Sequence, residues 1–202
     1  MKVLLMRHGK TAGNLQRRYI GRTDEPLCPE GIAHLRATGS DPAVRRVYVS
    51  PLRRCRETAA IKFPNAEQIV IPGLREMDFG DFEGRCADEM AQDADYRAWL
   101  EGNCMGPCPN GESGEGFIRR VASCFDELAR ACIERGEEDL IIVAHGGTAM
   151  SVLWSFAQEK REYYEWGLGN GCYYQAEIED LTWCTNPVLK NVTLHEIISK
   201  KA

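Results

Sequence analysis

Residues 3–14 read VLLMRHGKTAGN and place a group of polar residues directly after an apolar run. The run Val3–Met6 is short and continuously apolar, which is typical of a strand buried on both faces of a sheet. It ends abruptly at Arg7, His8 and Gly9. Ligands of open α/β sheets bind in the crevice beyond the carboxyl ends of the strands. The segment therefore predicts a ligand site that contains His8.

A second segment repeats this arrangement late in the chain. Residues 140–144 read LIIVA and run directly into His145, Gly146 and Gly147. This segment is again an apolar strand that ends in histidine and glycine. If the two strands are neighbours, their carboxyl ends lie at the same edge of the sheet. We expect His8 and His145 to meet there.

The rest of the chain alternates between short apolar runs and helical patterns. We expect further strands at 46–50, 69–71, 172–178 and 189–194, the last at a sheet edge. We expect helices from Pro29, with Ile32, Ala33 and Leu35 facing the core, and over 53–61, 85–101, 117–135 and 149–158. Residues 74–84 and 102–116 are rich in glycine and turn formers, and we expect loops there, the second a lid candidate. The alternation favours an α/β fold with a mainly parallel sheet covered on both faces, a three-layer α/β/α sandwich.

Composition indicates an ordinary globular protein. The 202 residues suit a single domain over 1–202, with 44% apolar and 27% charged residues. A formal net charge of −5 argues against a nucleic-acid binder, which needs a basic surface. Arginines nevertheless gather in the first third of the chain, and this asymmetry suggests a small anionic ligand: Arg17, Arg18, Arg22, Arg45, Arg46, Arg53, Arg54 and Arg56.

Neither membrane association nor a disulfide framework is indicated. No segment reaches the roughly 20 apolar residues that span a bilayer, and the start lacks a secretory signal core. The nine cysteines are odd in number, scattered and without a C-x-x-C pair, which disfavours a zinc or thioredoxin-like site. A loop disulfide between Cys104 and Cys108 is less favoured than free thiols. We expect a reduced, cytoplasmic protein.

The residues at the two strand ends are suited to chemistry at phosphorus. Neutral imidazole is a nucleophile at physiological pH, so His8 can form a covalent intermediate. A transferred phosphoryl group needs fixed donors, and guanidinium groups supply planar, permanently charged ones. Arg7 and Arg54 are the candidates, with His145 and Asn14 beside them, although Arg54 could also belong to a solvated helix face. A leaving alkoxide needs a proton, for which the candidates are Glu76, Asp78 and Asp81.

Taken together, these blocks resemble the histidine phosphatase, or phosphoglycerate mutase-like, superfamily. The resemblance covers most of the chain. It rests on Arg7-His8-Gly9 with Thr11 and Asn14, on Arg18, Gly21, Asp24, Pro26 and Leu27, on Ser50–Arg54 with Thr58-Ala59, on Leu74-Arg75-Glu76 with Gly80 and Glu83-Gly84, and on His145-Gly146-Gly147. The resemblance implies a phosphoglycerate mutase-like fold and an enzyme that uses no metal or other cofactor.

The resemblance also implies roles for individual residues. His8 becomes the phosphohistidine, Glu76 the acid and base, and Arg7, Arg54 and His145 the other catalytic residues. Substrate binding falls to Asn14, Thr11, Gly21 and Gly146.

Within the superfamily, two segments are most similar to α-ribazole 5′-phosphate phosphatases of cobalamin biosynthesis. They are residues 18–27 and residues 109–113, the latter preceding a helix that carries Arg120. Lys10 and Ile20 depart from residues common in the superfamily and leave the substrate open. The alternatives are a broad-specificity phosphatase, a phosphoglycerate mutase-like enzyme and a non-catalytic binder of phosphorylated ligands. The expected partner is a small phosphate ester, with no nucleic acid and no membrane; the oligomeric state is open, a homodimer included.

Overall fold

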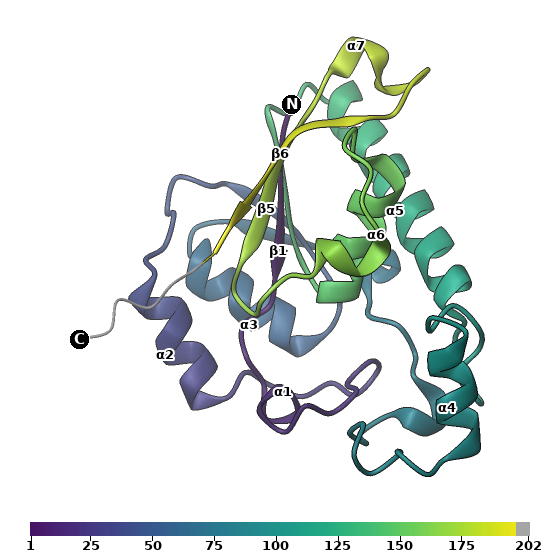
Figure 1. The fold of residues 1–202 in the computed structure, drawn as a ribbon. Helices are drawn as coiled ribbons and strands as arrows, with labels where there is room; N and C mark the ends of the chain where they lie inside the picture. Colours follow the sequence, from purple (N-terminus) through teal and green to yellow (C-terminus); the bar gives the residue numbers. More distant parts are fainter. Residues whose placement is uncertain (197–202) are drawn as a thin grey trace.

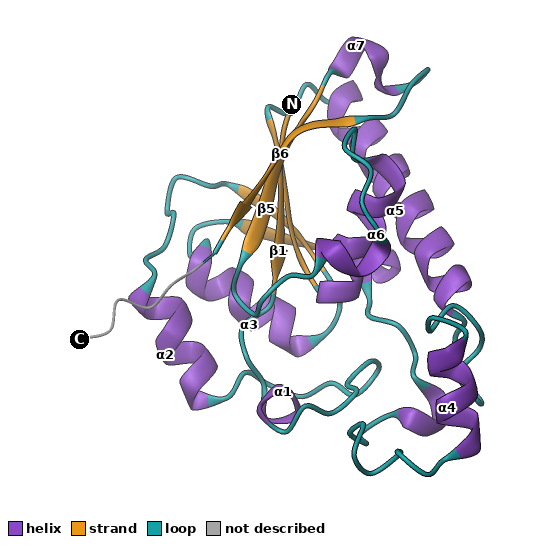
Figure 2. Ribbon diagram, viewed as in Figure 1, coloured by secondary structure: helices purple, strands orange, loops and turns teal. Residues whose placement is uncertain are grey.

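A six-stranded sheet organises the computed structural model, which describes residues 1–196. Its strand order is β3-β2-β4-β1-β5-β6 (Figure 2). The parallel strands are β1 (Lys2–Arg7), β2 (Arg46–Val49), β3 (Glu67–Val70) and β4 (Asp139–Ala144). The antiparallel strands are β5 (Tyr173–Ile178) and the edge strand β6 (Leu189–His195). The expected mainly parallel sheet is confirmed.

Helices cover both faces of this sheet (Figure 1). On one face lie α2 (Pro29–Ala37) and α3 (Arg53–Lys62), and on the other lie α5 (Gly114–Glu134) and α6 (Gly146–Phe156). Each face has its own buried apolar cluster. The α3 side packs Cys55, Ala59 and Phe63 on strand residues, whereas the α5 side is larger and includes Phe125 and Val152. The three-layer α/β/α arrangement is therefore confirmed.

The pairing of β1 with β4 brings the two histidine segments together. Arg7 lies opposite Ala144 in the parallel register. The pairing continues one residue further, because the His8 amide donates to the Ala144 carbonyl at 3.0 Å. The Ser50 amide donates to Val143 at 3.1 Å from the other side of β4. His8, Ser50 and His145 thus leave three adjacent strands at one edge of the sheet.

The longest helix of residues 1–196, α5, has a capping side chain at its start and a glycine after its end. The Ser113 hydroxyl accepts the Gly116 amide at the start, and Gly136 follows the helix with a φ of +67°. A positive φ is adopted by glycine without steric cost, so Gly136 allows the chain to turn away. The helix starts at Gly114, inside the segment 102–116 that was predicted as a loop.

The expected helix over 85–101 is wrong in its first half. Residues 87–92 form turns, and α4 spans only Ala94–Glu101. The Asp93 carboxylate accepts the amides of Asp95 and Tyr96 and pairs with Arg85, so it caps the helix at this point. In α2, Leu35 is buried and Ile32 partly so, but Ala33 faces solvent, contrary to expectation.

Short elements complete the described chain: α1 (Ala12–Leu15), α7 (Asp180–Trp183), and the 3₁₀ turns η1 (Pro72–Leu74), η2 (Gly80–Phe82) and η3 (Tyr163–Trp166). All nine cysteines are free, Cys104 and Cys108 included. Among residues 1–196 the structure contains no helix that is both long enough and apolar enough to cross a membrane.

Candidate active site

His8 lies buried at the end of β1 with one ring nitrogen already engaged. Its Nδ1 is 2.7 Å from the carbonyl of Gly9, an acceptor, so Nδ1 carries the proton. The lone pair is therefore on Nε2. Burial and the nearby Arg54 and Arg7 lower the pKa of His8 well below 6.5. The ring is neutral at physiological pH and has a free nucleophilic nitrogen.

His145 lies next to it, as the two strand ends predict. The centroids of the two imidazole rings are 5.2 Å apart, in an edge-on arrangement. Ser50 Oγ lies 2.8 Å from Nε2 of His145 and fixes the ring. Burial, and then the charge of Arg54, lower the pKa of His145 well below 6.5 as well. Ser50 belongs to a sequence block that we singled out, but its contact with His145 depends on the β2–β4 pairing.

Two arginines converge on the histidines. Arg7 donates to the Leu168 carbonyl, while its Nε is buried without a hydrogen-bond partner. Arg54 is 1% exposed and donates to the carbonyls of Ile20, Gly21 and Thr23. The solvated-helix alternative for Arg54 is therefore wrong.

No carboxylate in residues 1–196 lies within 4.0 Å of the Arg7 or Arg54 guanidinium. A buried charge without a partner costs several kcal/mol. Burial accordingly lowers the pKa of Arg7. The arrangement is suited to an anion that supplies the missing charge.

Glu76 is the acidic residue of the 74–84 segment at this site. Its Oε1 accepts the Met77 amide at 3.1 Å, and the Gly147 amide also donates to the carboxylate. Burial raises its pKa above 4.5, although Arg54 and Arg7 oppose the shift. Asp78, by contrast, accepts the Gly80 amide and faces Arg22, and Asp81 accepts the Asn110 amide. Of the three acids considered, Glu76 alone contacts the histidine-bearing rim, through Gly147.

The side-chain oxygen of Asn14 accepts two hydrogen bonds, which fix the orientation of its amide group. Its Oδ1 accepts the Thr11 amide at 3.2 Å and the Asn170 Nδ2 at 3.1 Å. Thr11, in turn, caps α1 by accepting the Asn14 amide. Asn170 also donates to the His8 carbonyl at 3.2 Å. Asn170 was missed because nothing in its local sequence links it to residues 8–14, more than 150 positions earlier.

The remaining predicted residues act through the backbone. Gly21 gives its carbonyl to Arg54 and its amide to Glu83, and an added Cβ would lie 1.9 Å from the Met77 carbonyl. Glu83 also accepts the Thr23 amide, so it fixes the loop that receives Arg54. At Gly146, an added Cβ would lie 3.4 Å from the Arg7 guanidinium. These glycines leave room for the site rather than adding functional groups to it.

Two further residues brace the site. The Thr58 hydroxyl accepts the Gly9 amide and donates to the Arg54 carbonyl, and so ties α3 to the His8 loop. Arg120 pairs with Glu112 and donates to the carbonyls of Gly73, Arg75 and Glu76. Arg120 therefore holds the backbone that carries Glu76.

Two cavities meet at Glu76. One, of about 220 Å³, is mostly apolar and is lined by six aromatic side chains, Tyr19, Phe79, Trp99, Phe117, Tyr163 and Tyr164. The other, the polar cavity of about 370 Å³, is lined mainly by charged and polar residues, which include Arg22, Arg75, Asp78, Asn110 and Glu112. Trp166 is fully buried against Tyr174 and Arg161 and lines neither cavity.

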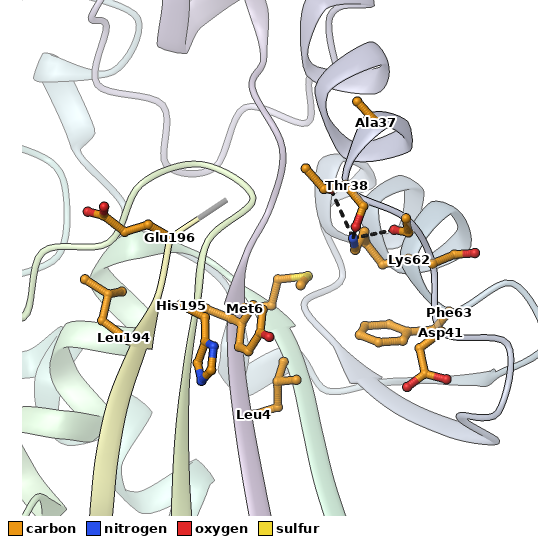
Figure 3. Close-up of a pocket in the computed structure, with 13 residues that line it drawn as sticks. Leu4, Met6, Ala37, Thr38, Asp41, Lys62, Phe63, Leu194, His195 and Glu196 are labelled. Carbon is orange, nitrogen blue, oxygen red and sulfur yellow. Dashed lines mark hydrogen bonds between the residues drawn. The ribbon is translucent and has the colours of Figure 1, made fainter. Parts of the chain in front are cut away.

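A further cavity, of about 940 Å³, lies elsewhere (Figure 3). It opens between the end of α2 and the strands β1, β5 and β6, and none of the predicted site residues lines it. Its buried cation, Lys62, donates to Thr38 and Gly39 at the end of α2. Lys62 thus satisfies carbonyls of the helix terminus.

Most of the other clustered arginines have carboxylate partners at the surface. Arg18 pairs with Glu89, Arg46 with Glu137 and Arg53 with Glu57. Of the arginines gathered in the first third of the chain, Arg54 is therefore the one that belongs to the site. Lys10, the unusual residue of the first segment, forms an exposed ion pair with Glu30 at 2.7 Å.

The chain is similar to known proteins in sequence and in fold. The model of the histidine phosphatase superfamily (branch 1) matches residues 3–186. The adenosylcobalamin/α-ribazole phosphatase of Salmonella typhimurium is 32% identical over 156 residues, which cover 73% of this chain and 75% of that protein. A broad-specificity phosphatase of Saccharomyces cerevisiae is 28% identical over 163 residues, 76% and 69% of the two chains. The crystal structure of phosphoserine phosphatase from Entamoeba histolytica with 3-phosphoglyceric acid has a TM-score of 0.73 at 26% identity and covers 97% of this chain and 98% of that one.

Proposed function

This chain belongs to the histidine phosphatase superfamily and is a phosphatase, and we propose that it hydrolyses phosphate monoesters through a phosphohistidine on His8, without a metal ion. The observation that carries the proposal is the pair of buried guanidiniums, Arg7 and Arg54, which lack a carboxylate partner beside two neutral imidazoles. A phosphate dianion supplies the absent negative charge. It also accepts hydrogen bonds from the unpaired Arg7 Nε and from the free Nδ2 of Asn14.

In the first step, Nε2 of His8 attacks phosphorus, and the bond from phosphorus to the ester oxygen breaks. The leaving oxygen takes the proton of Glu76, whose raised pKa favours the protonated form. Arg7, Arg54 and His145 meet the charge on the phosphoryl oxygens. The positions of these groups at the carboxyl edge of the sheet support this assignment of roles.

In the second step, water attacks the phosphohistidine. The Glu76 carboxylate takes a proton from the water, the nitrogen–phosphorus bond breaks, and inorganic phosphate leaves. The site returns to its starting protonation state. Both steps use His8 and Glu76, as expected of a double displacement through a covalent intermediate.

For the substrate we propose α-ribazole 5′-phosphate, and with it a place in cobalamin biosynthesis. The similarity to the Salmonella typhimurium enzyme supports this choice. The yeast relative favours broad specificity as the second candidate. A panel of α-ribazole 5′-phosphate, phosphoserine, 3-phosphoglycerate and para-nitrophenyl phosphate, assayed in EDTA, separates the two.

We expect hydrolysis to persist in EDTA and the His8→Ala protein to be inactive on every ester. A kcat/KM for α-ribazole phosphate at least 100-fold above the others supports the narrow substrate. Equal values support broad specificity. Loss of all activity in EDTA, or wild-type turnover by His8→Ala, overturns the proposed mechanism.

A further inference from the structure

The aromatic cavity beside Glu76 has a lining that specifies a ligand class. Besides the six rings, it is lined by apolar residues that include Met77, Met105, Ile118 and Met150. Glu76 is the only charged side chain among the residues that line it. The cavity is therefore an apolar chamber with a carboxyl group at one end.

The three tyrosines of this chamber present rings rather than free hydroxyls. Tyr19 Oη is 2.8 Å from Tyr96 Oη, and Tyr164 Oη donates to the Asn103 carbonyl at 3.2 Å. Tyr163 Oη lies 3.2 Å from the Ser151 hydroxyl. Since these hydroxyls are engaged with the protein, they offer a ligand little hydrogen bonding. The chamber discriminates by shape and apolarity.

Glycine at position 147 keeps the chamber open to the acid. A Cβ there would lie 2.6 Å from Glu76 Oε1 and 3.0 Å from the Phe117 ring. Any larger residue would fill the space between the carboxyl group and the aromatic wall. A leaving group whose oxygen meets Glu76 can therefore extend directly into the chamber.

We infer that this chamber binds the leaving group of the substrate, and that the group is uncharged and aromatic, about the size of a bicyclic ring. This inference rests on the proposed function, because it assigns Glu76 to the leaving oxygen. An apolar cavity of about 150 Å³ suffices to hold a benzene molecule, so 220 Å³ accommodates a larger ring system. Rings packed edge-on or offset against the aromatic walls gain affinity beyond simple burial.

The same lining disfavours charged leaving groups. The carboxylate of phosphoserine or 3-phosphoglycerate would lose its hydration in the chamber and meet no cation, only Glu76. Such a group would have to enter the polar cavity instead, where Arg75 is exposed and Arg22 pairs with Asp78 at 3.5 Å. The two cavities thus make opposite demands on the substrate.

The test compares two esters with similar primary-alcohol leaving groups, 2-(1-naphthyl)ethyl phosphate and phosphoserine. Their affinities are measured calorimetrically on the His8→Ala protein, so that binding is read without turnover. We expect the naphthyl ester to bind about 100-fold more tightly, since it buries an aromatic ring. Tyr164→Ala should weaken the naphthyl ester about tenfold and leave phosphoserine unchanged, because Tyr164 is at the rim and 54% exposed.

Tyr173→Ala is the matched control. Tyr173 stacks on His195 and lines the cavity of Figure 3, and its loss should change neither affinity. Equal affinity for the two esters, or a naphthyl-ester affinity that falls with Arg75→Ala and not with Tyr164→Ala, overturns the chamber assignment. Failure of the proposed function is seen separately, as a wild-type protein that keeps the binding preference but hydrolyses neither ester.

Discussion

At the scale of single residues, hydrogen bonds from neighbouring groups determine which atoms of His8 and Asn14 are free to meet a ligand. His8 has its nucleophilic nitrogen free because Gly9 occupies the other one. Asn14 has its donor free because Thr11 and Asn170 occupy its acceptor. The residue types at these positions could be predicted from the sequence. Their orientation could not, since it is set by partners that only the fold brings near.

Asn170 offers a direct test of that orientation. We expect Asn170→Ala to lower kcat/KM about tenfold and to weaken inhibition by inorganic phosphate by a similar factor, because Asn14 can then rotate its amide. Asn170→Asp should be at least as impaired, since a carboxylate cannot donate to Asn14. Asn65→Ala, which removes an exposed amide bonded to Pro42, is the control. An Asn170→Ala protein with normal phosphate inhibition would refute the positioning role.

The raised pKa of Glu76 gives a second residue-scale prediction. Activity needs Glu76 protonated, so the rate should fall as the pH rises through the pKa of Glu76, which lies above 4.5. Activity also needs His8 neutral, so the rate should fall as the pH drops through the pKa of His8, which lies well below 6.5. Glu76→Gln should remove the fall at high pH. In single turnovers that follow formation of the phosphohistidine alone, it should slow alkyl esters by about 10²- to 10⁴-fold. Para-nitrophenyl phosphate should be slowed far less in this step, because its leaving group needs no proton. Equal losses on both esters would argue against Glu76 as the acid.

At the scale of elements, strand ends were predictable and helix boundaries less so. β1 and β4 are continuously apolar and end at histidines, and the structure pairs them as expected. The helix predicted over 85–101 starts at Ala94 instead, because Asp93 caps it and residues 87–92 form turns. Likewise, α6 starts at Gly146 rather than near Ala149, which makes His145 the residue before the helix. The Asp93 cap sets the first of these boundaries, and the spacing of apolar residues does not reveal it.

The loop of residues 20–23 is the element whose placement is most open to test. Glu83 accepts the amides of Gly21 and Thr23, and the same loop gives its carbonyls to Arg54. We expect Glu83→Ala to free this loop and to lower kcat/KM about tenfold, without contact between Glu83 and substrate. Glu101→Ala, an exposed carboxylate at the end of α4, should be neutral. The test is the kcat/KM of both variants. A Glu83→Ala protein with the wild-type kcat/KM would contradict the proposal that this loop supports Arg54.

At the scale of the whole molecule, folding places two buried cations at one edge of the sheet, and no carboxylate of residues 1–196 lies within 4.0 Å of either guanidinium. Arg7 comes from β1 and Arg54 from α3, and the sheet order brings them to the same histidines. The excess of arginines in the first third of the sequence suggests an anionic ligand, but four of those eight arginines form surface ion pairs: Arg18, Arg22, Arg46 and Arg53. Burial, which composition does not reveal, separates Arg54 from its neighbours.

This arrangement predicts that an anion stabilises the fold. Inorganic phosphate at 100 times its Kd should add about 2.7 kcal/mol to the free energy of unfolding, by binding the folded state alone. For a chain of this size, that is a rise in Tm of several degrees. Arg54→Met should abolish the phosphate-dependent rise, whereas Arg53→Ala, which removes an exposed arginine paired with Glu57, should keep it. A rise that survives in Arg54→Met would place the anion elsewhere.

The most direct measurement of the central claim is rapid-quench mass spectrometry of the wild-type protein mixed with para-nitrophenyl phosphate. The double displacement predicts a phosphoryl adduct that is acid-labile, maps to His8, forms at least as fast as turnover and is absent from His8→Ala. A protein that turns over with no adduct at His8, or a His8→Ala protein that hydrolyses the ester at the wild-type rate, would contradict it.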